Sequence, residues 1–181
     1  LLTGGAGFIG TNVMKHLNEE GLQNILLVDN IGHSDKWENT LDCRFMAYYH
    51  KDELFSEIEK YQSKLRAVIH LGACSSTTEK DGKYMMANNY DYSKTLLNYC
   101  LKNRIDFVYA SSAAVYGNGN NGFVEETKAE YPLNVYGFSK FSFDNYVRRV
   151  LKKAEIQILG LRYFNVYGPQ ENHKRRMASV A

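Results

Sequence analysis

The sequence is poor in cysteine, in net charge and in long apolar runs, and each shortage argues against a class of protein. Its three cysteines, Cys43, Cys74 and Cys100, show no C-x-x-C spacing, so neither a disulfide framework nor a zinc site is indicated. The formal net charge of +2 gives no sign of a nucleic-acid or membrane-surface protein. No apolar run is long enough to span a bilayer. We therefore expect a cytoplasmic protein with no membrane partner.

Two further groups of residues also argue against other functions. The five histidines show no ligand spacing, and we predict no metal site. A basic cluster, HKRR at His173 to Arg176, has no aromatic residues between its charges, so we expect no nucleic-acid partner.

Short apolar runs alternate with helical patterns along the chain. Continuous Val, Ile and Leu runs are typical of strands buried on both faces, so we predict an α/β fold with a doubly wound parallel sheet of the Rossmann type. The expected strands are Ile25–Asp29, Ala67–Ala73, Phe107–Ser112 and Ile156–Phe164, and the expected helices are Phe8–Glu20, Glu53–Gln62, Tyr84–Asn103 and Val135–Lys153. Site residues should lie in the loops after the strands, because these share one rim of a parallel sheet.

The stretch TGGAGFIG carries three glycines, Gly4, Gly7 and Gly10, between a short apolar stub and a helix. In a dinucleotide-binding turn the first glycine permits the tight turn, the second lets the backbone approach a pyrophosphate, and the third allows close packing of helix on strand. Asp29 ends the next apolar run, at the spacing expected for a ribose partner. The motif therefore predicts a bound dinucleotide.

The residues alone leave the choice of dinucleotide open. Asp29 favours NAD, because a carboxylate binds the ribose 2′-hydroxyl and repels a 2′-phosphate. Lys36 and Lys51 lie downstream, where they offset that charge or stand as solvated surface lysines.

Candidate catalytic residues lie in the second half of the chain. YGFSK places Tyr136 and Lys140 four residues apart on one face of an expected helix, where an ammonium lowers the pKa of a nearby phenol. Ser112, at the end of the preceding strand, is placed to hold a substrate alcohol between itself and Tyr136. Each residue alone is more often structural, but together they indicate proton transfer at a carbinol.

The whole chain resembles the extended short-chain dehydrogenase/reductase superfamily. The motifs that carry the resemblance are the glycine motif, HLGA, SSAAVYG, YGFSK and RYFNVYGP. Within this superfamily, GACSSTTEKDGKYMMANNY and HKRRMASVA resemble the ADP-L-glycero-D-manno-heptose 6-epimerase family. The resemblance implies an isomerase that uses NADP rather than NAD and inverts C6 of ADP-heptose, by oxidation and re-reduction, for lipopolysaccharide core synthesis in a Gram-negative bacterium. It also implies a homo-oligomer.

The resemblance assigns roles by position. It implies that Tyr136 and Lys174 are acid/base residues, that Ser112 and Lys140 assist them, and that Asn165 and Arg176 contact substrate. The implied cofactor contacts are Gly4, Gly7, Phe8, Ile9, Gly10, Asp29, Asn30, Lys36, Lys51, Leu71, Gly72, Ala73, Cys74, Ser75, Asn88, Lys140, Val166 and Lys174.

Alternatives remain at this stage. A UDP-hexose 4-epimerase would share Tyr136 and Lys140, and a non-catalytic dinucleotide-binding fragment is the other candidate. A dehydratase is disfavoured, because Ala113 and Ala114 follow Ser112 where an added acid would be needed. We expect residues 1–165 to form the NADP-binding domain and residues 166–181 to begin a substrate region. Without the rest of that region, we expect the chain alone to be inactive.

Overall fold

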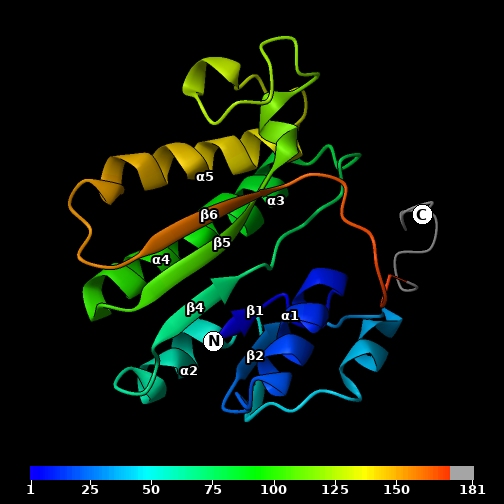
Figure 1. Ribbon diagram of the computed structural model, residues 1–181, viewed down its shortest axis with the longest axis vertical. Helices are drawn as coiled ribbons and strands as arrows, with labels where there is room; N and C mark the ends of the chain where they lie inside the picture. Colours follow the sequence, from blue (N-terminus) through cyan, green and yellow to red (C-terminus); the bar gives the residue numbers. More distant parts are fainter. Residues whose placement is uncertain (172–181) are drawn as a thin grey trace. The chain divides into compact units, whose positions relative to one another are not determined.

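The computed structural model describes residues 1–171 and divides into two compact units. Unit 1 holds residues 1–72 and the described residues from 165 onward, and unit 2 holds residues 73–164. The strands are β1 (Leu2–Thr3), β2 (Leu26–Asp29), β3 (Ala47–His50), β4 (Ala67–His70), β5 (Asp106–Ser112) and β6 (Ile158–Tyr163) (Figure 1). The α-helices are α1 (Phe8–Glu19), α2 (Leu54–Glu57), α3 (Gly82–Met86), α4 (Tyr92–Asn103) and α5 (Val135–Leu151).

Unit 1 is built on parallel strands in the order β3-β2-β1-β4. The four residues of β2 are all buried, as expected for a strand covered on both faces. Leu2, Met14, Ile25 and Leu27 form a core cluster that joins β1 and β2 to α1. This order matches the first four strands of the Rossmann arrangement 3-2-1-4-5-6, which binds a dinucleotide at the carboxyl ends of its strands.

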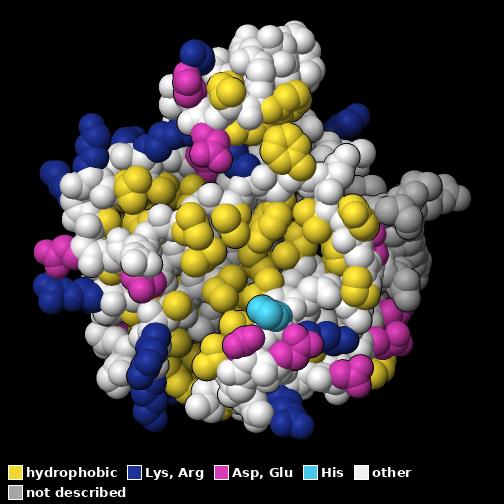
Figure 2. Space-filling view, in the orientation of Figure 1, with side chains coloured by type: hydrophobic (Ala, Val, Ile, Leu, Met, Phe, Trp, Pro, Cys, Tyr) yellow, Lys and Arg dark blue, Asp and Glu magenta, His cyan; other side chains and the backbone are white. Residues whose placement is uncertain are grey.

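Unit 2 pairs β5 with β6 in parallel and packs α4 and α5 against β5 (Figure 1). Residues of β5 alternate between buried and half-buried after an exposed Asp106. Figure 2 shows hydrophobic side chains over β6, where Leu159 and Leu161 are exposed. Both units have the expected α/β character with parallel strands, so the Rossmann-type fold class is confirmed.

Several expected elements differ in detail. The expected helix 53–62 is a short α2 followed by a 3-10 turn, Ile58–Tyr61. The expected helix 84–103 contains a π-helical turn, Ala87–Asp91, between α3 and α4. Strand β3 was not expected, because its sequence AYYH is aromatic and partly exposed rather than a continuous aliphatic run. Hydrogen bonding to β2 decides its conformation. The expected domain boundary at residue 165 stays a prediction.

Candidate functional site

The glycine turn of unit 1 is shaped by close backbone approach. Gly4 has φ +69°, and a Cβ there would lie 2.6 Å from the backbone nitrogen of Gly72. A Cβ on Gly10 would overlap the carbonyl oxygen of Gly4. At Gly7, by contrast, a Cβ would meet only the Gly4 oxygen, at 3.3 Å. Gly4 and Gly10 thus hold the turn together, and Gly7 leaves the backbone open at the start of α1.

The N-terminus of α1 suits an anionic ligand. Gly7 is the N-cap residue, no described side chain caps the helix, and its first turn carries no acidic residue. Phe8 and Ile9 open the helix, where backbone N–H groups lack intrahelical acceptors and the helix dipole favours negative charge. These features fit a dinucleotide pyrophosphate, as the glycine spacing predicts.

Asp29 is the last residue of β2, and both oxygens of its carboxylate accept hydrogen bonds. One oxygen, Oδ2, accepts a hydrogen bond from the Ala6 backbone at 2.9 Å. The other, Oδ1, accepts from the Asn30 backbone at 2.7 Å and from the Lys36 ammonium at 2.5 Å. The Asp29 side chain is 6% exposed and that of Lys36 20%, so this ion pair is largely shielded from water. Of the two candidate lysines, Lys36 is the one that offsets the Asp29 charge.

Lys51 has a different environment. Its ammonium lies 3.0 Å from Asp52 Oδ1, although its backbone N–H donates to the carbonyl of Asp29 at 3.1 Å. His50 Nε2 lies 3.2 Å from Asn30 Oδ1. The structure therefore brings Asn30 and Lys36 to the Asp29 carboxylate but directs the Lys51 side chain to a neighbouring acid.

The loop after β4 contains the next expected cofactor contacts. Leu71 and Gly72 belong to unit 1, where both backbone N–H groups donate to Thr3, at 3.1 Å each. Ala73, Cys74 and Ser75 begin unit 2.

Asn89, which the sequence did not single out, anchors the beginning of unit 2. Its amide accepts from the Cys74 backbone N–H at 2.8 Å and donates to the Cys74 carbonyl at 2.9 Å. It also donates to Ser139 on α5 at 3.1 Å, and Asn88 beside it donates to Asn89 Oδ1 at 3.2 Å. Asn89 follows Asn88, an expected cofactor contact, and this position was the only sign of its role in the sequence. A single sequence does not show that Asn89 is buried.

Ser112 and Tyr136 come together where β5 ends and α5 begins. Burial raises the pKa of the Tyr136 phenol above its ordinary value, and a hydrogen bond with the Ser112 side chain acts in the opposite direction. Ser112 Oγ also accepts from the Ala114 backbone at 3.1 Å, so it caps the 3-10 turn that follows β5. Asn134 caps α5 by accepting from the Gly137 backbone at 2.7 Å, which fixes the first turn that carries Tyr136.

Lys140 lies one helical turn beyond Tyr136 and is buried. Its ammonium donates to the carbonyl oxygen of Ala110 on β5 at 2.8 Å. Burial lowers the pKa of Lys140 to about 8, and the charge of Asp144 opposes that change. In the chain by itself the pKa of Tyr136 is raised, because burial outweighs the Ser112 hydrogen bond. The expected effect of the Lys140 ammonium on this pKa stays a prediction.

The remaining expected contacts lie near the end of the described chain. Asn165 and Val166 belong to unit 1, as does Pro169, whose carbonyl accepts a hydrogen bond from Asn12 on α1 at 3.0 Å. Lys174 and Arg176 lie outside the described residues. Among residues 1–171, no helix is both long and apolar enough to cross a membrane. Within that same part of the chain, no three His, Cys, Asp or Glu side chains gather as a metal site would require.

The solved structures similar to this chain include sugar-nucleotide epimerases. ADP-L-glycero-D-manno-heptose-6-epimerase from Helicobacter pylori is 32% identical with a TM-score of 0.80, covering 98% of this chain and 58% of its own. UDP-glucuronic acid 4-epimerase from Bacillus cereus, in complex with NAD, is 30% identical with a TM-score of 0.80, covering 94% and 58%. UDP-N-acetylglucosamine 4-epimerase from Methanobrevibacter ruminantium is 28% identical with a TM-score of 0.84, covering 99% and 58%.

This chain thus spans about 58% of the length of these solved structures. Because heptose and UDP-sugar epimerases match it to a similar degree, the comparisons support the epimerase class rather than one sugar. Two epimerases of similar structure were solved with NAD, which does not support the expected preference for NADP. Residues 1–181 match the model described as the NAD dependent epimerase/dehydratase family. The chain therefore belongs to the NAD-dependent epimerase/dehydratase family.

Proposed function

We propose that the protein epimerises a nucleotide-activated sugar by removing and returning a hydride at one carbinol carbon. The observation that carries the proposal is the grouping of Ser112, Tyr136 and Lys140 along β5 and α5 in unit 2. A hydroxyl, a phenol and a buried ammonium provide a proton acceptor, a hydrogen-bond partner for it and a positive charge.

Each of these groups has a defined task in that reaction. Tyr136 Oη takes the proton of the substrate hydroxyl during oxidation and gives it back during reduction. Ser112 holds the same hydroxyl and, through its hydrogen bond, lowers the pKa of the phenol. The Lys140 ammonium is fixed on the Ala110 carbonyl, where its charge favours the phenolate. When bound, a nicotinamide dinucleotide supplies the acceptor and donor of the hydride.

The substrate that we propose is ADP-glycero-manno-heptose, inverted at C6 for lipopolysaccharide core synthesis. The stretches at residues 72–90 and 173–181 support this choice, as does the similarity to the Helicobacter pylori enzyme. Lys174 then serves as the acid/base for the opposite face of the planar ketone, and Arg176 and Asn165 contact the substrate. One acid/base for each orientation explains why Tyr136 alone would not suffice.

A UDP-sugar 4-epimerase is the second candidate. The similarity in fold to the Methanobrevibacter ruminantium 4-epimerase, with a TM-score of 0.84, favours it. A dehydratase has less support, since expulsion of water needs an additional acid. Ala113 and Ala114, which follow Ser112, carry none.

For the cofactor we propose NADP, on the basis of the Lys36–Asp29 ion pair. Asp29 would repel a 2′-phosphate if its charge were unbalanced. With Lys36 2.5 Å from the carboxylate, that repulsion is offset and a cation stands beside the expected ribose site.

The substrate proposal is tested by incubating the full-length protein with ADP-D-glycero-D-manno-heptose and following C6 by NMR. We expect inversion at C6. A parallel sample with UDP-glucose is followed at C4. Inversion at C4 without inversion at C6 would replace the heptose proposal by the second candidate.

A further inference from the structure

Asp144 is an acidic residue buried on the face of α5 that meets β5. Its side chain is 5% exposed. Oδ1 accepts a hydrogen bond from the Tyr109 hydroxyl at 3.0 Å, and Oδ2 accepts one from the Ser111 hydroxyl at 2.9 Å. Burying a carboxylate is costly unless it is hydrogen-bonded and balanced by charge, so its presence at this position requires a reason.

Asp144 continues a row that begins with two candidate catalytic residues. Tyr136, Lys140 and Asp144 follow one another at four-residue spacing, which places them on one face of α5. Lys140 donates to the Ala110 carbonyl, and Asp144 accepts from Tyr109 and Ser111, the residues on either side of Ala110. The two charged side chains are thus attached to three consecutive residues of β5.

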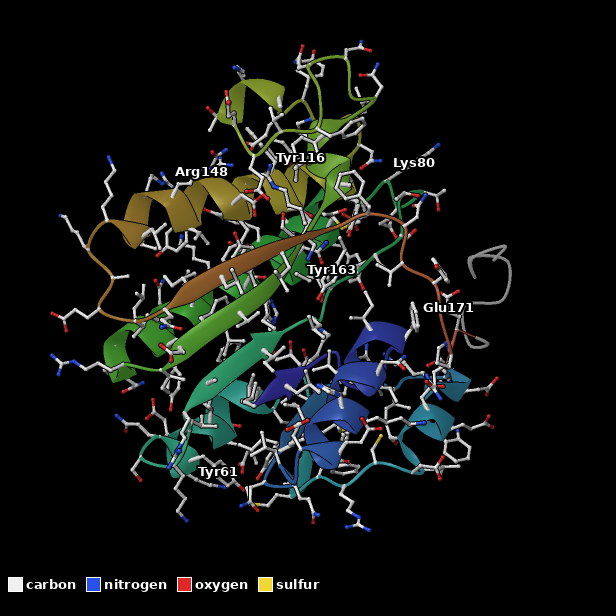
Figure 3. All side chains as sticks on the ribbon, viewed as in Figure 1. Tyr61, Lys80, Tyr116, Arg148, Tyr163 and Glu171 are labelled. Atoms are coloured by element: carbon white, nitrogen blue, oxygen red, sulfur yellow. The ribbon has the colours of Figure 1, made fainter. Side chains whose placement is uncertain are left out.

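Two guanidinium groups match the two carboxylates of this region. Arg162 on β6 lies 3.2 Å from Asp144 Oδ2, and it also pairs with Glu130. Glu130 is paired with Arg148 as well, which is labelled on α5 in Figure 3. Two carboxylates therefore face two guanidinium groups, and Lys140 is the third cation of this region.

We propose that Asp144 is a positioning residue for the sugar-nucleotide reaction, whose carboxylate fixes α5 on β5 and provides the negative charge that faces Lys140 from inside the fold. This rests on the proposed function, since Lys140 acts on the substrate side through Tyr136. Because its side chain is only 5% exposed, we assign Asp144 a role through Lys140 rather than through contact with the substrate.

The charges around Lys140 support this role. Burial lowers the pKa of Lys140 to about 8, and the Asp144 charge acts against that loss. Tyr109 on β5 and Arg162 on β6 contact Asp144 from other elements, and Glu130, in the loop before α5, pairs with Arg162 in turn. Tyr136 lies one turn before Lys140 on α5. Without the carboxylate, Lys140 would lose its proton at a lower pH and cease to favour the Tyr136 phenolate.

The test is an NMR titration of this chain labelled with ¹³C and ¹⁵N in lysine, with the Lys140 resonance assigned by its absence in Lys140→Arg. Exposed lysines titrate near 10.4, so the Lys140 midpoint, expected at about 8 in the wild type, is resolved from them. In Asp144→Asn, which removes the charge but keeps the shape, we expect the midpoint to fall by about one pH unit. An unchanged midpoint in a folded variant would overturn the proposal.

Two further variants separate charge from hydrogen bonding. Tyr109→Phe removes one donor to the carboxylate but leaves its charge, so the Lys140 midpoint should not fall. Asp144→Glu keeps the charge and should restore the midpoint toward that of the wild type. A fall in Tyr109→Phe equal to that in Asp144→Asn would assign the effect to packing and contradict the proposal.

A measurement on the wild-type chain covers the case in which Asp144→Asn does not fold. In a wild-type sample labelled with ¹³C in aspartate, the ¹³Cγ resonance of Asp144 should show an inflection at the Lys140 midpoint, because the two charges interact. Its absence would also overturn the proposal. Since none of these measurements needs a substrate, they separate a failure of this inference from a failure of the sugar assay.

Discussion

The two units of the chain build their parts of the candidate site by different means. In unit 1 the glycine turn depends on main-chain approach, with Gly4 against Gly72 and Gly10 against Gly4. In unit 2 the site depends on buried polar side chains, and Lys140 and Asp144 are each less than a tenth exposed.

The two units therefore tolerate different kinds of substitution. A backbone turn needs only the absence of side-chain atoms, so a single added methyl group disrupts it sterically. Buried charges need their partners, so a change that preserves shape but removes charge disrupts them electrostatically. Pairs of substitutions separate these two kinds of dependence.

The largest effect is expected for the phenol of unit 2. Tyr136→Phe should lower the epimerisation rate of the full-length protein by roughly 10²- to 10⁴-fold, because general acid–base catalysis is lost. Tyr146→Phe removes a hydroxyl from the same helix, where it donates to Asn98, and should leave the rate unchanged. NMR of the sugar product measures both rates. Comparable rates for the two variants would remove Tyr136 from the chemistry.

The second largest effect, on stability, is expected for Glu130, a buried carboxylate that pairs with two arginines. Glu130→Ala leaves Arg148 and Arg162 without their shared carboxylate and should cost about 4 kcal/mol of unfolding free energy. Glu126→Ala breaks an exposed pair with Lys128 and should cost less than about 1 kcal/mol. Urea denaturation followed by circular dichroism gives both values. Equal losses would show that burial does not govern these ion pairs.

A smaller effect is expected in the glycine turn. Gly4→Ala adds a methyl group against the Gly72 backbone at a positive φ and should cost about 3 kcal/mol. Gly21→Ala is the matched control, since Gly21 also has a positive φ, +82°, but nothing lies within 4 Å of its added Cβ. We expect it to cost about 1 kcal/mol. The same denaturation experiment would refute the steric argument if the control lost as much.

The smallest effect concerns cofactor choice. Lys36→Met exposes the Asp29 charge and should weaken NADP binding about tenfold, or about 1.4 kcal/mol, while leaving NAD binding nearly unchanged. Lys51→Met, whose ammonium pairs with Asp52, should change the ratio less. Calorimetric titration of both dinucleotides measures the ratio. A wild-type chain that prefers NAD, with no change in Lys36→Met, would reject the NADP proposal.

The sequence predicted most of the regular elements, because their patterns are local. The expected strand 107–112 differs from β5 by one residue, and the expected helix 135–153 ends two residues after α5. Strand β3 and the π-helical turn were not predicted, since pairing with β2 and packing decide them rather than residue preference. Ser112, Tyr136 and Lys140 were singled out by type and spacing. Asn89 and Asp144 were not, because polar residues on a helix are usually exposed.

By itself the sequence determined the glycine turn, the alternation of strands and helices, and the spacing that puts Tyr136 and Lys140 on one helix face. These features follow from backbone stereochemistry and helical periodicity, which act over a few residues. Only the tertiary structure decided that Lys36 pairs with Asp29 and that the charge of Asp144 acts on Lys140. Burial also decided that the pKa of Tyr136 is raised and that of Lys140 lowered, because desolvation depends on every element packed around a group.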